Sequence, residues 1–198
     1  ENAEITIEVN PGTVTLEKLE DYNKVGINRL SIGLQSTHEH LLKEIGRIHT
    51  YLDFLDTFRF AREAGFENIN VDLMIGLPNQ TLAEVQDSIE EIVSMEPEHI
   101  SVYSLILEEG TPLFKKVEEG LELPDEELER KMYWTVKQIL EANGYNHYEI
   151  SNFAKQGYES KHNLDCWNQK EYIGFGVAAH SYTNGIRYSN IENLEQYI

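Results

Sequence analysis

The sequence predicts an α/β protein, a TIM-like partial barrel of (β/α) units, and two observations support this prediction. Segments that alternate apolar and polar residues are each followed by a segment with apolar residues at helical spacing. Short turns rich in Gly, Pro and Asn separate these segments, as in Asn10-Pro11-Gly12 and Gly76-Leu77-Pro78. Repeated βα units with short connections form a parallel sheet or a barrel.

Each element of the barrel has its own signal in the sequence. The alternating residues 4–9 stop at the first turn, and apolar residues at helical spacing then run to Gly26, a residue typical of helix ends. A helix begins at Thr81 with a capping box, because Glu84 stands three residues later. We expect strands over residues 4–9, 29–35, 68–75 and 99–107, and helices over residues 16–25, 39–45, 51–64 and from Thr81 onward.

The pattern changes after Gly110-Thr-Pro112. An acidic run precedes a helix whose apolar stripe lies between Leu128 and Leu140, and we interpret this run as a solvated helix start favoured by the helix dipole. Residues 145–198 hold half of the aromatic side chains and indicate a loop-rich segment. We therefore divide the chain into a barrel part, residues 1–114, and a C-terminal part, residues 115–198.

Composition excludes several classes of protein. The 198 residues contain 16 Lys and Arg against 35 Asp and Glu, and this formal net charge of −19 repels nucleic-acid phosphates, so no nucleic-acid partner is expected. No stretch reaches the roughly 18 consecutive apolar residues of a membrane helix, so we expect no integral membrane segment. The single cysteine, Cys166, indicates a reducing compartment, the cytoplasm, and leaves no site of several thiolates within these residues.

Polar side chains share one face of the first three strands. In strand register, Glu8, Gln35 and Asp72 lie opposite the apolar faces and near the C-terminal ends of consecutive strands. A polar barrel interior is costly to bury unless something polar fills it, and ligands bind at this end of such strands. One such residue alone is more often paired with a neighbour or with water, but three in one register predict a site for a polar small molecule.

Arg47 adds a positive charge to this set. It follows the helix after the Gln35 strand, where its guanidinium can reach a carboxylate at the barrel mouth. Together with the two carboxylates, it forms a set suited to a zwitterionic nucleoside. The sequence leaves open whether Tyr103, on the fourth strand, lines the same site.

Four motifs occupy these strands and turns. They are Glu8-Val-Asn-Pro11, Leu30-Ser-Ile-Gly-Leu-Gln-Ser36, Arg47-Ile-His49 and Val71-Asp-Leu-Met-Ile-Gly-Leu-Pro78-Asn-Gln-Thr81. The set resembles the radical S-adenosylmethionine (SAM) family around oxygen-independent coproporphyrinogen III oxidase, over essentially the whole chain. The resemblance implies that Glu8, Gln35, Arg47 and Asp72 contact SAM, with Arg47 at the methionine carboxylate.

One part of the family's pattern is not found in these residues. The cluster-binding CxxxCxxC motif and the glycine-rich motif after it precede the position where this chain begins, so we expect a fragment whose [4Fe–4S] ligands lie outside it. These residues alone are then expected to form no radical and to be catalytically inactive. The strand over residues 4–9 is expected to leave an open sheet edge that favours aggregation.

Three further motifs lie in the C-terminal segment: Tyr148-Glu-Ile-Ser-Asn-Phe-Ala154, His162-Asn-Leu-Asp-Cys-Trp167 and Gly174-Phe-Gly-Val-Ala-Ala-His-Ser-Tyr182. They resemble the HemW branch of the family, whose members are regarded as heme chaperones and carry an HNxxYW motif linked to heme binding. The resemblance implies His162 as a candidate heme ligand; the alternative is a loop histidine bonded to backbone. Cys166 replaces the motif's tyrosine, which removes a phenol or supplies a second potential iron ligand.

The function expected from these resemblances is that of a HemW-like radical SAM protein. In the full chain it binds SAM, a [4Fe–4S] cluster, and heme for delivery to acceptor hemoproteins. The alternative is an enzyme, oxygen-independent coproporphyrinogen III oxidase, which decarboxylates propionate side chains by radical chemistry. The SAM residues are common to both, and the C-terminal motif favours the chaperone. A third, weaker possibility is a folded module with remnants of a SAM site and no heme role.

Overall fold

The computed structural model describes residues 3–198, which divide into two compact units. The first unit ends at Tyr158 and the second spans Glu159–Ile198, and each is described by itself. The division lies after Tyr158, whereas the division from the sequence lies after residue 114. The reason is that helix α6 (Glu126–Ala142) packs against helix α4 (Leu82–Ser94) and thereby belongs to the first unit.

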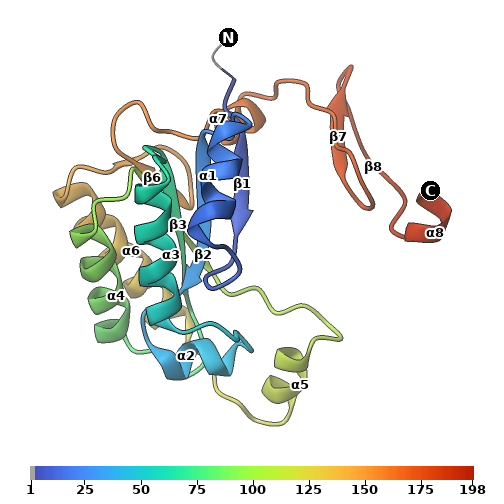
Figure 1. Cartoon of the computed structure of the whole chain (residues 1–198). Coiled ribbons are helices and arrows are strands. Elements are labelled where there is room, and N and C mark those ends of the chain that lie inside the picture. The colour runs from blue at the N-terminus through green and yellow to red at the C-terminus, as the bar shows by residue number, and fades with distance from the viewer. Residues whose placement is uncertain (1–2) are drawn as a thin grey trace. The chain divides into compact units, whose positions relative to one another are not determined.

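Strands and helices alternate along the first unit, as the sequence predicts (Figure 1). Besides α4 and α6, its elements are β1 (Thr6–Val9), α1 (Leu16–Lys24), β2 (Arg29–Gln35), α2 (Glu39–Glu44), α3 (Tyr51–Glu63), β3 (Ile69–Ile75), β4 (His99–Ser104), α5 (Pro112–Glu118), β5 (Asn146–His147) and β6 (Asn152–Ala154). The predicted α/β fold is confirmed, and the bounds of β2 are those expected from the sequence.

The strands of the first unit form one sheet in the order β1-β2-β3-β4-β6-β5. The pairs β1·β2, β2·β3 and β3·β4 are parallel, which is the arrangement expected for a partial barrel. Strand β6 pairs antiparallel with β4, and β5 pairs antiparallel with β6. The sequence predicts loops here, because strands of two and three residues carry no periodic signal; β6 forms by pairing with β4, and β5 by pairing with β6.

Two of the helices begin with the cap that the sequence encodes. Thr81 caps α4, and Thr50 caps α3, each with a complete capping box in which the third helical residue, Glu84 or Asp53, bonds back to the cap backbone. Thr50 stands three residues after Arg47, so this cap also defines where the Arg47 segment enters helix α3. The capping box predicted at Thr81 is confirmed.

The core lies between the apolar face of the sheet and helices α1, α3, α4 and α6. The alternating apolar residues of β2 and β3, together with aromatic residues of α3, supply most of it. Its fully buried side chains include Leu30, Ile32, Leu34, Val71, Leu73, Ile100, Phe54, Ile89 and Val136. Burying this face leaves the opposite face of the same strands to the polar side chains.

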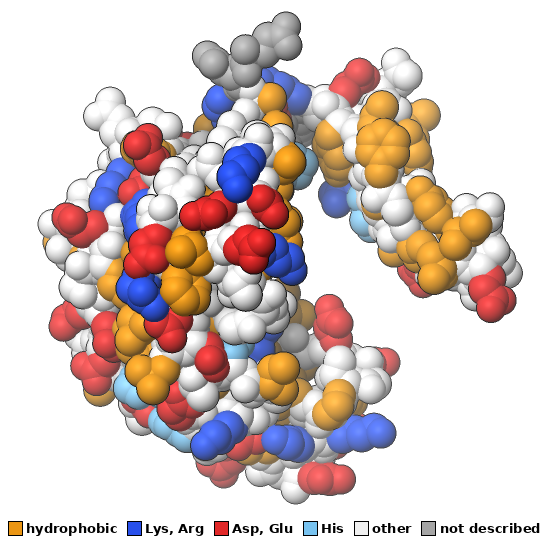
Figure 2. Space-filling model, in the orientation of Figure 1, with side chains coloured by type: hydrophobic (Ala, Val, Ile, Leu, Met, Phe, Trp, Pro, Cys, Tyr) orange, Lys and Arg blue, Asp and Glu red, His pale blue; other side chains and the backbone are white. Residues whose placement is uncertain are grey.

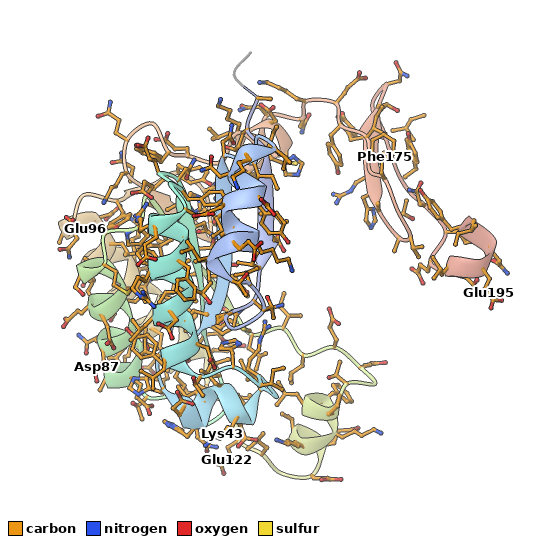
Figure 3. All side chains as sticks on the ribbon, viewed as in Figure 1. Lys43, Asp87, Glu96, Glu122, Phe175 and Glu195 are labelled. Carbon is orange, nitrogen blue, oxygen red and sulfur yellow. The ribbon has the colours of Figure 1, made fainter. Side chains whose placement is uncertain are left out.

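The second unit contains α7 (Lys161–Trp167), the antiparallel hairpin β7 (His180–Thr183) and β8 (Ile186–Ser189), and α8 (Leu194–Tyr197). Many of its apolar side chains are exposed, and they gather over the hairpin and α8 in the space-filling view (Figure 2). Phe175, labelled in Figure 3, is 86% exposed. An aromatic-rich segment is thus present, as the sequence predicts, although it contains more regular structure than expected.

Candidate functional site

Tyr103 on β4 lies within electrostatic reach of the four side chains predicted to form the site. Its hydroxyl donates to Gln35 Oε1 at 2.9 Å. Burial raises the pKa of that hydroxyl; the charges of Asp72 and Glu8 add to the shift, and the Gln35 bond and the Arg47 charge oppose it. Tyr103, which the sequence left open, therefore belongs with the candidate site residues.

A break in strand register turns Gln35 toward Tyr103. The pairing of β2 with β3 shifts between Gly33 and Gln35, and Gln35 has a φ of 76°, in the left-handed region that non-glycine residues rarely adopt. A Cβ on Gly33 would lie 3.1 Å from Gln35 Nε2 and 3.5 Å from Asn10 Oδ1. Glycine at this position leaves space for the glutamine amide, and the bulge aims it along the polar face.

Arg47 is held at the same edge of the sheet by Asn10. Its Nη1 donates to Asn10 Oδ1 at 3.0 Å, and Asn10 follows directly after β1. The remaining guanidinium nitrogens are available for an anionic group, since no other bond of Arg47 is found among the described residues.

Asp72 is the most elaborately bonded member of the set. Asn70 Nδ2 donates to Asp72 Oδ1 at 2.7 Å, and Ser31 Oγ donates to Asp72 Oδ2 at 3.1 Å. Burial raises the pKa of Asp72, while bonds from Asn70, Ser101 and Ser31 and the charge of Arg29 oppose the shift. Donors on both oxygens fix the plane of the carboxylate, so its remaining lone pairs have defined directions.

Asn70 connects Asp72 to a buried histidine. Asn70 Oδ1 lies 2.6 Å from His99 Nδ1, and His99 Nε2 lies 2.7 Å from the Tyr148 hydroxyl. His99 is fully buried, and burial together with the Arg29 charge lowers its pKa to about 3, so the imidazole is neutral. The sequence carried a signal for His99, because His99, Ser101 and Tyr103 stand at alternate positions and so share one face of β4.

Arg29 brings a buried positive charge to the start of β2. The residue is 6% exposed, and its Nε has no hydrogen-bond partner among the described residues. Its charge acts on both Asp72 and His99, favouring the ionised carboxylate and the neutral imidazole.

The candidate heme ligand, His162, belongs to the second unit. It lies on helix α7 rather than on the loop expected from the sequence, and its side chain is exposed. Its Nε2 is 3.7 Å from Cys166 Sγ, one helical turn later. Its ring lies edge-on to the ring of Tyr172, with 6.0 Å between the ring centroids. Ser160 caps the helix, so His162 is its second residue.

Two tests of fit follow from these donors. Carboxylate, amide and guanidinium groups match a zwitterionic nucleoside, so the residues fit SAM. A [4Fe–4S] cluster does not fit, because the chain has one cysteine, and within residues 3–198 no group of three or more His, Cys, Asp and Glu side chains could hold a metal ion.

Two surface properties bear on the expected partners. Acidic side chains are spread over the visible face of the first unit with basic ones between them (Figure 2), and the net charge of the sequence is −19. None of the helices in the described part of the chain has the length and apolar character needed to cross a membrane.

Comparisons with known proteins agree with these observations. Residues 1–92 match the model of the Radical SAM superfamily. The heme chaperone HemW of Bacillus subtilis is 47% identical over 197 residues, or 99% of this chain and 52% of that protein. HemW of Lactococcus lactis is 41% identical over 196 residues, or 98% and 52%. The chain thus spans about half the length of these curated relatives.

A solved structure provides the fold comparison. Coproporphyrinogen III oxidase (HemN) from Escherichia coli, described as a radical SAM enzyme, superposes with a TM-score of 0.81 at 24% identity. The match covers 98% of this chain and 48% of that one. At this identity the likeness is one of fold.

Proposed function

Because this chain is a HemW-like member of the radical SAM superfamily, we propose that residues 3–158 bind SAM and that the C-terminal segment binds heme for delivery to acceptor hemoproteins. The observation that carries the first part is that Glu8, Gln35 and Asp72 lie on adjacent strands of one parallel sheet, with Gln35 bonded to Tyr103 and Arg47 bonded to Asn10 directly after β1. SAM, with a [4Fe–4S] cluster whose ligands lie outside these residues, supplies radical chemistry when bound. A cytoplasmic site of action remains an expectation from the single cysteine.

Each proposed SAM contact follows from the charge of the group. Arg47 binds the methionine carboxylate, because a guanidinium already oriented by Asn10 has further N–H groups to donate. Asp72 and Glu8 accept from the amino group or the ribose hydroxyls. Gln35 gives its Oε1 to Tyr103, which leaves its Nε2 hydrogens for an acceptor on the nucleoside.

The heme part of the proposal rests on His162. Its exposed imidazole on α7 is an accessible axial ligand, and the half-exposed Trp167 on the same helix provides an aromatic face for a porphyrin. Heme is cargo in this proposal, and an exposed ligand suits a protein that must release it. The alternative function, the oxidase, has a likeness of fold in its favour, whereas the HemW proteins of Bacillus subtilis and Lactococcus lactis are 47% and 41% identical to this chain.

Arg47→Ala is expected to weaken SAM binding by about 1.5–3 kcal/mol, the range for a hydrogen bond to a charged group. Isothermal titration calorimetry on the full-length protein measures this loss. Arg59→Ala is the matched control, because Arg59 is an exposed arginine on α3 that pairs with Asp56 and Glu63 of the same helix. An Arg47→Ala affinity equal to that of the control would contradict the carboxylate assignment.

His162→Ala is expected to reduce hemin affinity at least tenfold, since an axial ligand bond to iron is lost. Anaerobic hemin titration of the full-length protein, followed at the Soret band, measures this. His180→Ala, which changes another exposed histidine of the second unit, is the control. Wild-type protein that binds no hemin specifically would favour the oxidase, which is then assayed with coproporphyrinogen III. Binding that survives His162→Ala would move the ligand elsewhere, to Cys166 first.

A further inference from the structure

A continuous row of buried and partly buried hydrogen bonds crosses the sheet to Asp72. It runs from the Tyr148 hydroxyl through His99 and Asn70 to the Asp72 carboxylate, with contacts of 2.7, 2.6 and 2.7 Å. His99 and Asn70 are 0% and 2% exposed. The row joins the proposed SAM site to the segment between β5 and β6, which also belongs to the first unit.

The carboxylate fixes the direction of every bond in this row. An ionised carboxylate only accepts, so the group of Asn70 facing Asp72 is its NH2, which also donates to Ser31 Oγ at 2.8 Å. Asn70 Oδ1 therefore faces His99 and Ser101 and must receive protons, as it does from Ser101 Oγ at 3.0 Å. His99 in turn carries its proton on Nδ1, and its Nε2 accepts from the Tyr148 hydroxyl.

One alternative arrangement shows why direction matters. If the imidazole proton moved to Nε2, the bare Nδ1 would face Asn70 Oδ1 at 2.6 Å, two acceptors in contact. Rotating the Asn70 amide would relieve that contact, but its oxygen would then face a carboxylate oxygen of Asp72, again two acceptors in contact. Each link therefore depends on the next: Asn70 Oδ1 holds the proton of His99 on Nδ1, and the Tyr148 hydroxyl donates to the Nε2 that this tautomer leaves bare.

We propose that Tyr148, His99 and Asn70 are positioning residues for SAM, a directional hydrogen-bond relay that presents the Asp72 carboxylate to its ligand. This inference rests on the proposed function, because it takes Asp72 as a SAM contact. It adds that Tyr148, in the turn between β5 and β6, influences SAM affinity from outside the site. If Tyr148, His99 and Asn70 only stabilised the fold, their polar groups would need hydrogen-bond partners, but it would not matter which group donates and which accepts.

The matched pair Tyr148→Phe and Tyr145→Phe tests the relay. Both remove one phenolic hydroxyl from neighbouring positions, but the Tyr145 hydroxyl donates to the Pro97 carbonyl at 2.7 Å and has no link to Asp72. Calorimetry on the full-length protein is expected to give SAM binding about fivefold weaker for Tyr148→Phe and unchanged for Tyr145→Phe. Asn70→Asp, which replaces the donor facing Asp72 by an acceptor, is expected to weaken binding more than tenfold.

The tautomer of His99 is a second readout that packing alone would not move. Nitrogen-15 NMR of histidine-labelled protein is expected to give a pyrrole-type Nδ1 and a pyridine-type Nε2 for His99 in the wild type and in Tyr145→Phe. Tyr148→Phe is expected to keep the Nδ1–H tautomer, which Asn70 Oδ1 holds, and to move the Nε2 resonance toward that of a pyridine-type nitrogen without a hydrogen-bond donor. An Nε2–H tautomer in the wild type would overturn the relay.

The outcomes separate the relay from the proposed function. Wild-type protein that binds no SAM, or binds it as well after Asp72→Asn, contradicts the proposed function. Wild-type binding that Asp72→Asn abolishes, but that Tyr148→Phe leaves unchanged, contradicts the relay alone. Equal losses in Tyr148→Phe and Tyr145→Phe would mean that affinity follows stability, which also overturns it.

Discussion

Phe54→Ala is expected to lower the free energy of unfolding by about 3–5 kcal/mol, the range for truncating a buried phenylalanine. Phe54 is fully buried on α3, and its ring lies 5.9 Å from those of Tyr51 and Phe58. Truncation leaves a cavity between α3 and the sheet that neighbouring side chains fill only in part. Urea denaturation followed by circular dichroism measures the change.

The control for Phe54→Ala lies two residues away on the same helix. Leu52 is 71% exposed, so Leu52→Ala is expected to change stability by less than about 0.5 kcal/mol. Similar losses in the two variants would contradict the assignment of Phe54 to the core. Because α3 begins at the Thr50 cap just after Arg47, Phe54→Ala is also expected to weaken SAM binding at temperatures near its unfolding transition.

Acid is expected to destabilise the protein through His99. Its pKa in the folded protein is about 3, while an unfolded histidine has a pKa near 6.5, so between these values the unfolded state binds more protons. The contribution of neutral His99 to the free energy of unfolding is therefore complete above about pH 6.5. It is lost as the pH falls toward 3, with a total of about 4 kcal/mol. Besides burial, the charge of Arg29 acts on this ring, and the Tyr148 hydroxyl lies 2.7 Å from its Nε2.

The difference between wild type and His99→Gln isolates this contribution from the many carboxylates. Unfolding free energies measured from pH 8 to pH 3.5 are expected to fall more steeply for the wild type. His162→Gln, at an exposed histidine, is expected to follow the wild-type profile. Parallel profiles for wild type and His99→Gln would mean that His99 is accessible to protons in the folded state.

Long periodic segments made the barrel part predictable from sequence. The apolar alternation in β2 and β3 and the stripes of α3 and α4 are strong because each buries one face against a large core. The short elements α5, β5, β6 and α7 were not predicted, since segments of two to seven residues depend on tertiary pairing that periodicity does not reveal. Strand β4 also ends at Ser104 rather than at residue 107.

The site was predictable in part, for a related reason. Register alone assigned Glu8, Gln35 and Asp72 to one face, and the structure brings them near Arg47 and Tyr103. Register could not reveal the bulge at Gln35 or the bond from Arg47 to Asn10, because both depend on backbone geometry between strands. The roles of these residues toward SAM, and of His162 toward heme, remain predictions for the measurements above.

The polar row across the sheet has a consequence for folding fidelity. Its members are partners in strand register: Ser31 faces Asn70, Asn70 faces His99, and Asp72 faces Ser101. A slip of β3 by one residue would exchange its faces, driving an amide and a carboxylate into the aliphatic layer and leaving His99 without its acceptor. The same side chains that we propose to serve ligand binding thus also destabilise misaligned pairings of β3 and favour the native strand register.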